Sequence, residues 1–296
     1  MVGVIGRFAP SPSGALHMGS LVAALGSFLQ ARAQGGKWLL RIDDLDIPRV
    51  ESGAINKIVD TLEFFGLRWD GEVLYQSGRR DDYARAITYL KAAGYAFDCA
   101  CTRREARSGR AGIEGPIYPG TCRRGLPAGR TARSIRLRVS EAPIVVTDAI
   151  QGCYTQRLDR DIGDFVIRRA DGIVAYQLAT VLDDAYQGVT EVVRGADLLS
   201  STPRQIAIQQ ALGLHTPLHA HLPVVVDETG EKLGKSTGAI PLRPRNGAAQ
   251  LFQCLRWLGQ SPPNTLHDVS VSRLLEWSLD NWSLSRVPSG PQLGGR

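Results

Sequence analysis

The chain has 296 residues, of which 43% are hydrophobic and 22% charged, and its formal net charge is +6. This balance is that of a soluble globular protein and excludes wholesale disorder and collagen-like repeats. No apolar run approaches the ~20 residues of a membrane span, and the first residues lack a secretory signal pattern. Five cysteines, an odd and low number, argue against a disulfide scaffold and predict a reducing, cytoplasmic location.

The first hundred residues alternate strand and helix patterns. Leu21, Leu25 and Phe28 share one face of a predicted helix that stops at a Gly-Gly pair. Such alternation predicts an α/β fold with a parallel sheet covered by helices. The predicted strands are 3–8 and 38–42, and the predicted helices are 20–33, 52–65 and 79–93.

The pattern changes near residue 99, where Gly, Pro and Arg become frequent and periodicity is weak. Short strands are predicted at 135–139, 144–147 and 165–168, helices at 176–185 and 203–212, and strands at 190–194 and 222–226. Further helices are predicted at 248–258 and 271–279, before a frayed tail of ten residues. We therefore expect a catalytic domain in two halves, 1–98 and 176–240, an insertion at 99–175, and a short helical region at 241–296.

The predicted insertion is strongly basic, with ten arginines between Arg103 and Arg138 against Glu105 and Glu114. A field of this kind suits a polyanion such as nucleic acid. An ordinary solvated arginine-rich face explains the same composition equally well.

The segment from Arg7 to Ser20 carries the first chemical motif. A predicted strand runs into a Pro/Gly/Ser turn, and a helix begins at His17-Met18-Gly19-Ser20. Ligands bind at the carboxyl ends of strands in open α/β sheets, and a helix N-terminus attracts phosphate. His17 could donate a hydrogen bond to a phosphoryl oxygen, although an isolated motif of this kind is also compatible with a plain turn.

The second motif is Lys232-Leu233-Gly234-Lys235-Ser236. Two lysines three residues apart can neutralise charge that develops on a triphosphate. A phosphate-cradling P-loop is excluded, because the glycines are one residue too close and Pro241 interrupts the helix that should follow.

Taken together, these motifs resemble the two signatures of class I aminoacyl-tRNA synthetases. Arg41-Ile42-Asp43-Asp44-Leu45-Asp46 and the segment 188–198 narrow the resemblance to the glutamyl/glutaminyl branch. It spans residues 4 to 245 and implies a Rossmann-like parallel sheet, with a zinc-bearing insertion, that joins glutamate to ATP as glutamyl-adenylate and passes it to tRNA. The sequence departs from the signatures at Met18, Ser20, Leu233 and Gly234, and it has Asp43 where most of the family carries Glu.

The resemblance also implies roles for individual residues. Charge stabilisation in the reaction falls to His17, Lys232 and Lys235. Glutamate is held by Arg7, Ser11, Asp43, Tyr176 and Arg194. ATP, with Mg²⁺, is bound by His17, Gly19, Ser20 and Lys235.

A third motif consists of Cys99-x-Cys101 and Tyr118-x-x-x-Cys122. Thiolates in a reducing compartment prefer zinc, and a metal would stabilise a loop without a core of its own. By spacing alone the fourth ligand is open among Tyr118, Asp98, Glu114 and Cys153, and unliganded thiols remain an alternative. The resemblance narrows here to the short glutamyl-queuosine tRNA(Asp) synthetases, which hold structural zinc through three cysteines and a tyrosine, and so implies Tyr118.

Other candidate ligands are expected to be ordinary. Cys153 and Cys254 are predicted to be small buried apolar residues. His215, His219 and His221 are predicted to be loop residues, because no cysteine or carboxylate completes a metal site at suitable spacing.

Only about sixty residues follow Ser236, whereas a full glutamyl-tRNA synthetase continues with about one further domain. The resemblance therefore implies a monomer without an anticodon-binding domain or membrane partner. Its substrates would be L-glutamate, ATP and the queuosine-bearing anticodon stem-loop of tRNA(Asp), cradled by the basic insertion. The alternatives are a truncated enzyme that charges a tRNA 3′ end, a non-catalytic tRNA-binding paralogue, and a ligase acting on a small molecule.

Overall fold

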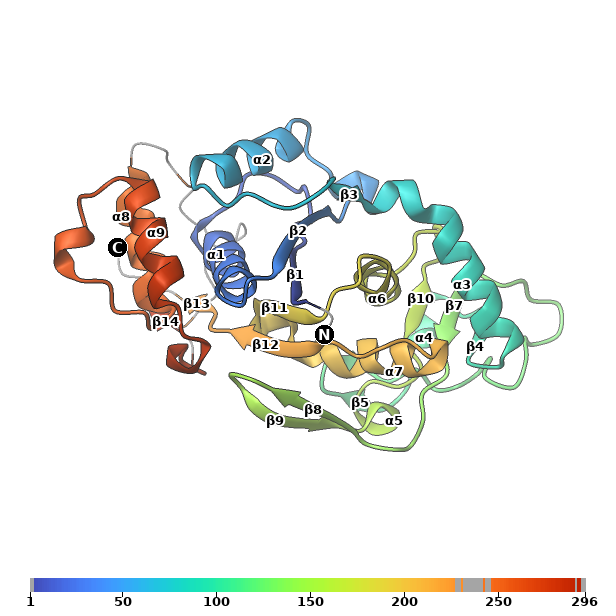
Figure 1. The fold of residues 1–296 in the computed structure, drawn as a ribbon. Coiled ribbons are helices and arrows are strands. Elements are labelled where there is room, and N and C mark those ends of the chain that lie inside the picture. Colours follow the sequence, from blue (N-terminus) through green and yellow to red (C-terminus); the bar gives the residue numbers. More distant parts are fainter. Residues whose placement is uncertain (1–2, 227–229, 231–241, 243–245, 291, 294–296) are drawn as a thin grey trace.

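The computed structural model describes residues 3–226, 230, 242, 246–290 and 292–293. The Lys232–Ser236 motif and part of the predicted tail lie outside the described residues. Figure 1 shows mixed strands and helices, with the C-terminal helices at one end of the molecule and the cysteine-bearing segment at the other. None of the helices in the described ranges is both long and apolar enough to cross a bilayer.

Two mainly parallel sheets form the centre of the molecule. The first has the order β1 (Ile5–Phe8), β2 (Lys37–Ile42), β3 (Leu74–Tyr75), and the second β11 (Glu191–Gly195), β12 (Leu218–Leu222), β8 (Ile144–Asp148), β9 (Gly152–Gln156), with β9 antiparallel. The backbone N–H of Thr190 donates to the Ile5 carbonyl at 3.0 Å, so β1 and β11 begin side by side. Their carboxyl ends therefore lie at one edge, where open α/β folds bind ligands.

The connecting helices build the main core. Leu21, Leu25 and Leu29 of α1 (Met18–Ala33) are fully buried together with Trp38 of β2. The C-terminal helices pack against α1 from outside (Figure 1). Because α1 is covered in this way, its N-terminus is held firmly at the sheet edge. The helices around these sheets are α2 (Ala54–Phe64), α6 (Tyr176–Tyr186), α7 (Thr202–Leu212), α8 (Gly247–Trp257) and α9 (Val271–Asn281).

A separate antiparallel sheet carries the cysteine-bearing segment. Its order is β10 (Val166–Arg168), β7 (Ser134–Leu137), β4 (Ala96–Cys99), and α3 (Arg80–Ala92) lies beside β4. The remaining short elements are η1 (Ile47–Arg49), η2 (Gln76–Arg79), α4 (Arg103–Ala106), β5 (Ala111–Gly112), β6 (Gly115–Pro116), α5 (Leu158–Asp161), η3 (Ala196–Ser201), β13 (Val225–Val226), η6 (Asn264–Leu266), η7 (Leu284–Arg286) and β14 (Gln292–Leu293).

The structure corrects three expectations from sequence. The strand predicted at 222–226 is split into β12 and β13, because Pro223 between them has no N–H to continue the ladder. As a consequence His219 and His221 are not loop residues but buried members of β12. Cys153 is exposed on the edge strand β9 rather than buried, whereas Cys254 is buried as predicted.

Candidate active site and cysteine cluster

A cavity of about 520 Å³ opens where the carboxyl ends of β1, β2 and β11 meet the N-terminus of α1. Its size is that of a small-molecule site. Every predicted glutamate- or ATP-binding residue that the structure describes lines this single cavity: Arg7, Ser11, His17, Gly19, Ser20, Asp43, Tyr176 and Arg194. Residues far apart in the sequence are therefore brought together, while Lys232 and Lys235 lie outside the described residues.

The N-terminus of α1 forms one wall. His17 is its N-cap, and the His17 Nδ1 atom accepts a hydrogen bond from the backbone N–H of Ser20 at 3.4 Å. In the neutral ring the proton must then lie on Nε2. The first turn carries no acidic side chain, so the positive end of the helix dipole is uncompensated. This wall is suited to a phosphate group.

Behind the cavity lies a group of six alternating charges that we call the buried ion cluster. Asp184 bridges two arginines: the Arg7 Nε donates to Oδ1 at 3.2 Å and the Arg41 Nη1 at 2.5 Å. Burial opposes ionisation of Asp184, but the charges of Arg7 and Arg41 outweigh it and hold its pKa at about 2. The cluster contains three cations and three acids: Arg7, Arg41, Arg79, Asp43, Asp183 and Asp184.

Asp43 is the member of the cluster that stands where most of the resembling family carries Glu. Arg41 Nε donates to its Oδ1 at 2.8 Å, and its side chain is 6% exposed. Burial raises the pKa of Asp43 to about 6, despite the opposing charge of Arg41. Asp43 is therefore an anion at neutral pH and faces the cavity, as a partner for an ammonium group should.

Arg194 enters the cavity from β11 with a different set of partners. Its Nε donates to the His221 Nε2 at 3.0 Å, and its Nη2 donates to the Thr202 Oγ1 at 2.8 Å. These acceptors are uncharged, and no described carboxylate forms an ion pair with Arg194. The buried Nη1 has no hydrogen-bond partner within the described part of the chain.

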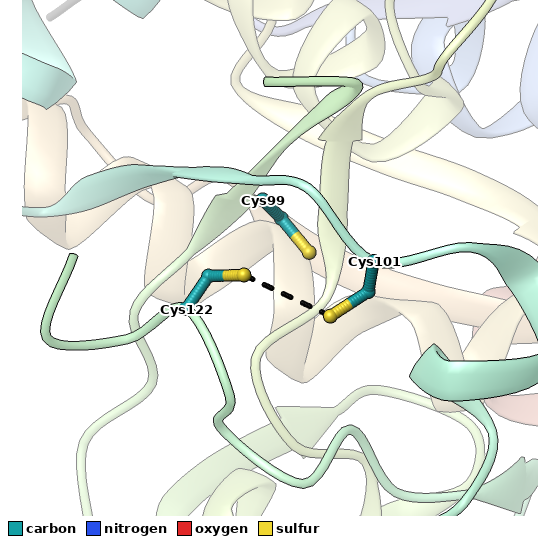
Figure 2. Close-up of side chains that lie close together, drawn as sticks. All are labelled: Cys99, Cys101 and Cys122. Carbon is teal, nitrogen blue, oxygen red and sulfur yellow. Dashed lines mark hydrogen bonds between the residues drawn. The ribbon is translucent and has the colours of Figure 1, made fainter. Parts of the chain in front are cut away.

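The three predicted cysteine ligands converge from β4 and the loop that follows it. Figure 2 shows the sulfur atoms of Cys99, Cys101 and Cys122 pointing toward one another, and all three sulfurs lie within 4.8 Å of each other. The Cys101 and Cys122 sulfurs are 3.7 Å apart. Tetrahedral zinc with Zn–S bonds of about 2.3 Å separates its sulfurs by about 3.8 Å. The cluster therefore fits a zinc ion.

Tyr118 lies in the same cluster. Its hydroxyl oxygen is 3.5 Å from the Cys99 sulfur and 3.7 Å from the Cys101 sulfur. Burial opposes ionisation of Cys99, but hydrogen bonding with Tyr118 and Arg136 lowers the pKa of this thiol to about 7. A thiol that is readily deprotonated is a good metal ligand. Of the four candidates for the fourth ligand, Tyr118 is placed beside the sulfurs.

Comparison with known proteins agrees with this geometry. The model of the catalytic domain of class I tRNA synthetases for E and Q matches residues 3–243. A glutamyl-Q tRNA(Asp) synthetase of Chromobacterium violaceum is 55% identical, over 97% of this chain and 96% of its own length. Its counterpart in Dechloromonas aromatica is 52% identical, over 96% of this chain and 95% of its own length. The chain belongs to the glutamyl-Q tRNA(Asp) synthetase family.

Solved structures support both the class I synthetase fold and the glutamyl branch of that class. A glutamate-tRNA synthetase of Elizabethkingia anophelis superimposes with a TM-score of 0.80 at 25% identity, covering 99% of this chain and 68% of that one. A glutamate tRNA ligase of Elizabethkingia meningosepticum, solved with its amino acid, gives a TM-score of 0.81 at 25% identity, covering 99% and 67%. The predicted class I synthetase fold and ligase class are thus confirmed.

The structure divides the arginines of the predicted insertion into two groups. Some build the insertion itself: the Arg136 guanidinium stacks 3.9 Å from the Tyr118 ring centre, and Arg130 pairs with Glu105 at 2.9 Å. Others are exposed, and their side chains form neither an ion pair nor a hydrogen bond with any described residue: Arg103, Arg104, Arg107, Arg124 and Arg133. Only the second group is free to contact a polyanion.

Sequence reasoning missed three buried residues that stand behind the cavity. Asp184, on α6, contacts Arg7 and Arg41 although it is more than 140 positions from either. His221 and Asp148 stand behind Arg194. Their only signal in the sequence is a polar residue inside an otherwise apolar pattern, which does not identify its partner.

Proposed function

We propose that this chain activates glutamate with ATP to glutamyl-adenylate without tRNA and then transfers glutamate to queuosine at the wobble position of tRNA(Asp). The observation that carries the proposal is the single cavity, which is lined by an uncompensated helix N-terminus together with Arg7 and Arg194. The strong similarity to glutamyl-Q tRNA(Asp) synthetases supplies the acceptor.

Each end of the cavity suits one reactant. Arg7 and Arg194 offer cationic donors for the carboxylates of glutamate, and Asp43 offers an anion for its ammonium group. Ser11 and Tyr176 add hydroxyl groups at the same cavity. A bidentate arginine favours glutamate over glutamine, because the amide replaces one acceptor by donors that face the guanidinium.

ATP is assigned to the wall formed by α1. Gly19 and Ser20 lie in its first turn, where the phosphates would meet unpaired backbone N–H groups, and the His17 Nε2–H would donate to the α-phosphate. Lys232 and Lys235 would neutralise the charge of the leaving pyrophosphate, which Mg²⁺ also binds. The glutamate carboxylate is itself the nucleophile, so no protein nucleophile is required.

Zinc is assigned a structural role. Cys99, Cys101, Cys122 and Tyr118 would hold it, and it would fix the loop that presents the exposed arginines. Those arginines would contact phosphates of the anticodon stem-loop, which gives affinity without reading sequence. We place this activity in the cytoplasm, where glutamate, ATP and tRNA are present, and assign it to a monomer.

The test offers labelled glutamate, ATP and Mg²⁺ to the purified protein with two tRNA pools, one from cells that make queuosine and one from cells that cannot. Label entering only the queuosine-containing pool, in tRNA(Asp), is the expected result. Label entering both pools would replace the proposal by charging of a tRNA 3′ end. Exchange of pyrophosphate without transfer to either pool would direct the search to a small-molecule acceptor. No glutamate-dependent exchange at all would indicate a non-catalytic paralogue.

A further inference from the structure

A chain of hydrogen bonds, which we call the relay, runs from Asp148 on β8 through His221 on β12 to Arg194 on β11. Asp148, at the end of β8, lies 2.6 Å from His221 Nδ1 on β12, and His221 Nε2 receives the Arg194 Nε–H from β11 at 3.0 Å. All three side chains are buried, with Asp148 and His221 completely so. Thr202 of α7 completes the arrangement by accepting from Arg194 Nη2.

The chemistry of these groups fixes the position of one proton. An arginine has only donors, so its Nε–H requires an unprotonated nitrogen on His221. The ionised Asp148 can only accept, so the His221 proton must lie on Nδ1. Burial opposes ionisation of Asp148, but hydrogen bonds from His221 and from backbone N–H groups outweigh it and hold its pKa at about 2. Burial and the Arg194 charge lower the pKa of His221 against the opposing bond to Asp148, which keeps the ring neutral.

Asp148 is itself held rigidly. Its Oδ1 accepts three backbone N–H groups, from Ile150 at 3.0 Å, Gln151 at 2.8 Å and His221 at 3.1 Å, so that Oδ2 alone remains for the imidazole. A carboxylate fixed in this way presents the imidazole with an acceptor at one defined place. The orientation of the ring, and with it that of the Arg194 guanidinium, follows from the turn between β8 and β9.

The two arginines that line the cavity, Arg7 and Arg194, differ in the charge of their hydrogen-bond acceptors. Arg7 shares its charge with Asp184 in a direct ion pair. Arg194 is fixed equally well, but by neutral acceptors, and among the described residues no carboxylate lies within 4 Å of its guanidinium. Its buried Nη1 has no hydrogen-bond partner among the described residues, and Arg194 lines the cavity in which the proposed substrate would bind.

We infer that Asp148 and His221 are positioning residues that orient Arg194 toward the carboxylate of the amino-acid substrate while leaving its charge uncompensated. The inference rests on the proposed function for the identity of that substrate. It requires no movement of the relay and no change of its protonation during the reaction. It assigns a role to two residues that do not line the cavity.

The decisive variant is Asp148→Asn. The amide oxygen can still accept the backbone N–H groups, but the amide nitrogen then donates to His221 Nδ1 and moves the proton to Nε2. That proton faces the Arg194 Nε–H, so two donors oppose each other and the guanidinium must turn away. In glutamate-dependent pyrophosphate exchange we expect the KM for glutamate to rise about tenfold or more, the loss of one charged contact, with the KM for ATP unchanged.

His221→Phe tests the same relay by another route, because it keeps a ring but removes the acceptor. It should raise the glutamate KM similarly, and the double variant should be no worse than the poorer single variant, since both act through one contact. His219→Phe is the matched control: this buried residue lies on the same strand, its ring parallel to His221 at 6.0 Å, with no side-chain hydrogen bond to a described residue. It should leave the glutamate KM within about twofold.

Two results would overturn the inference. One is an unchanged glutamate KM in folded Asp148→Asn or, should that variant not fold, in His221→Phe. The other is a ¹⁵N spectrum of the wild-type imidazole that places the His221 proton on Nε2. The spectrum also separates the two proposals, because it decides the relay even if the wild-type protein shows no glutamate-dependent exchange, which would refute the proposed function alone.

Discussion

The bridge formed by Asp184 makes a quantitative prediction about stability. Asp184→Asn removes the negative charge of a buried side chain and leaves Arg7 and Arg41 without their shared anion. A pKa lowered from 3.8 to about 2 corresponds to roughly 2–3 kcal/mol. Breaking a buried ion pair typically costs about 3–5 kcal/mol, because the partner stays buried and uncompensated. The cost of breaking a buried ion pair describes this substitution better, so we expect the free energy of unfolding to fall by about 3 kcal/mol or more at pH 7.

The assay is urea unfolding of wild type and variant across pH. Because the pKa of Asp184 is lower in the folded protein, its contribution is complete above the ordinary value near 4 and is lost as the pH falls toward 2. The difference between the two proteins should shrink over that interval. Asp171→Asn, which weakens a half-exposed pair with Arg169, is the control and should cost less than about 1 kcal/mol. A loss at pH 7 no larger than that of the control would refute the reasoning.

Three further predictions concern zinc and the reaction. Cys101→Ser should lower zinc content and melting temperature together, and an unchanged zinc stoichiometry by elemental analysis would exclude the metal site. Because burial raises the pKa of Asp43 to about 6, kcat/KM for glutamate should fall as the pH drops through 6, and Asp43→Asn should abolish that inflection; an inflection that persists would assign it to another group. Lys235→Ala should slow pyrophosphate exchange about a hundredfold, and a rate near that of wild type would remove Lys235 from catalysis.

The sequence predicted those features that depend on neighbours along the chain. Apolar periodicity located α1, α6 and α7 within one or two residues, because each helix buries a face that its own sequence encodes. The same reasoning failed at residues 218–226. There the strand is set by pairing with β11 and ends at Pro223, and the polar His219 and His221 are buried because their partners come from distant elements.

The residues of the cavity divide in the same way, into those that the sequence predicted and those that depend on distant elements. The positions of the sequence motifs predicted correctly that Arg7, His17 and Arg194 line one cavity. It could not show what stands behind them, since Asp184 and Asp148 are recognised only once the sheets are assembled. Candidate binding residues of this kind are found from motifs, whereas the residues that orient them require a three-dimensional structure.

The charges of the cavity connect stability with substrate choice. Among the described residues, the buried ion cluster is formally neutral, and Arg49 and Asp197, which also line the cavity, carry opposite formal charges. Arg194 therefore leaves one formal positive charge, the complement of a glutamate molecule, which carries two carboxylates and one ammonium group. Asp184→Asn adds a second positive charge behind Arg7. The substitution also removes the carboxylate that orients Arg7, so it should lower both the stability of the fold and the affinity for glutamate.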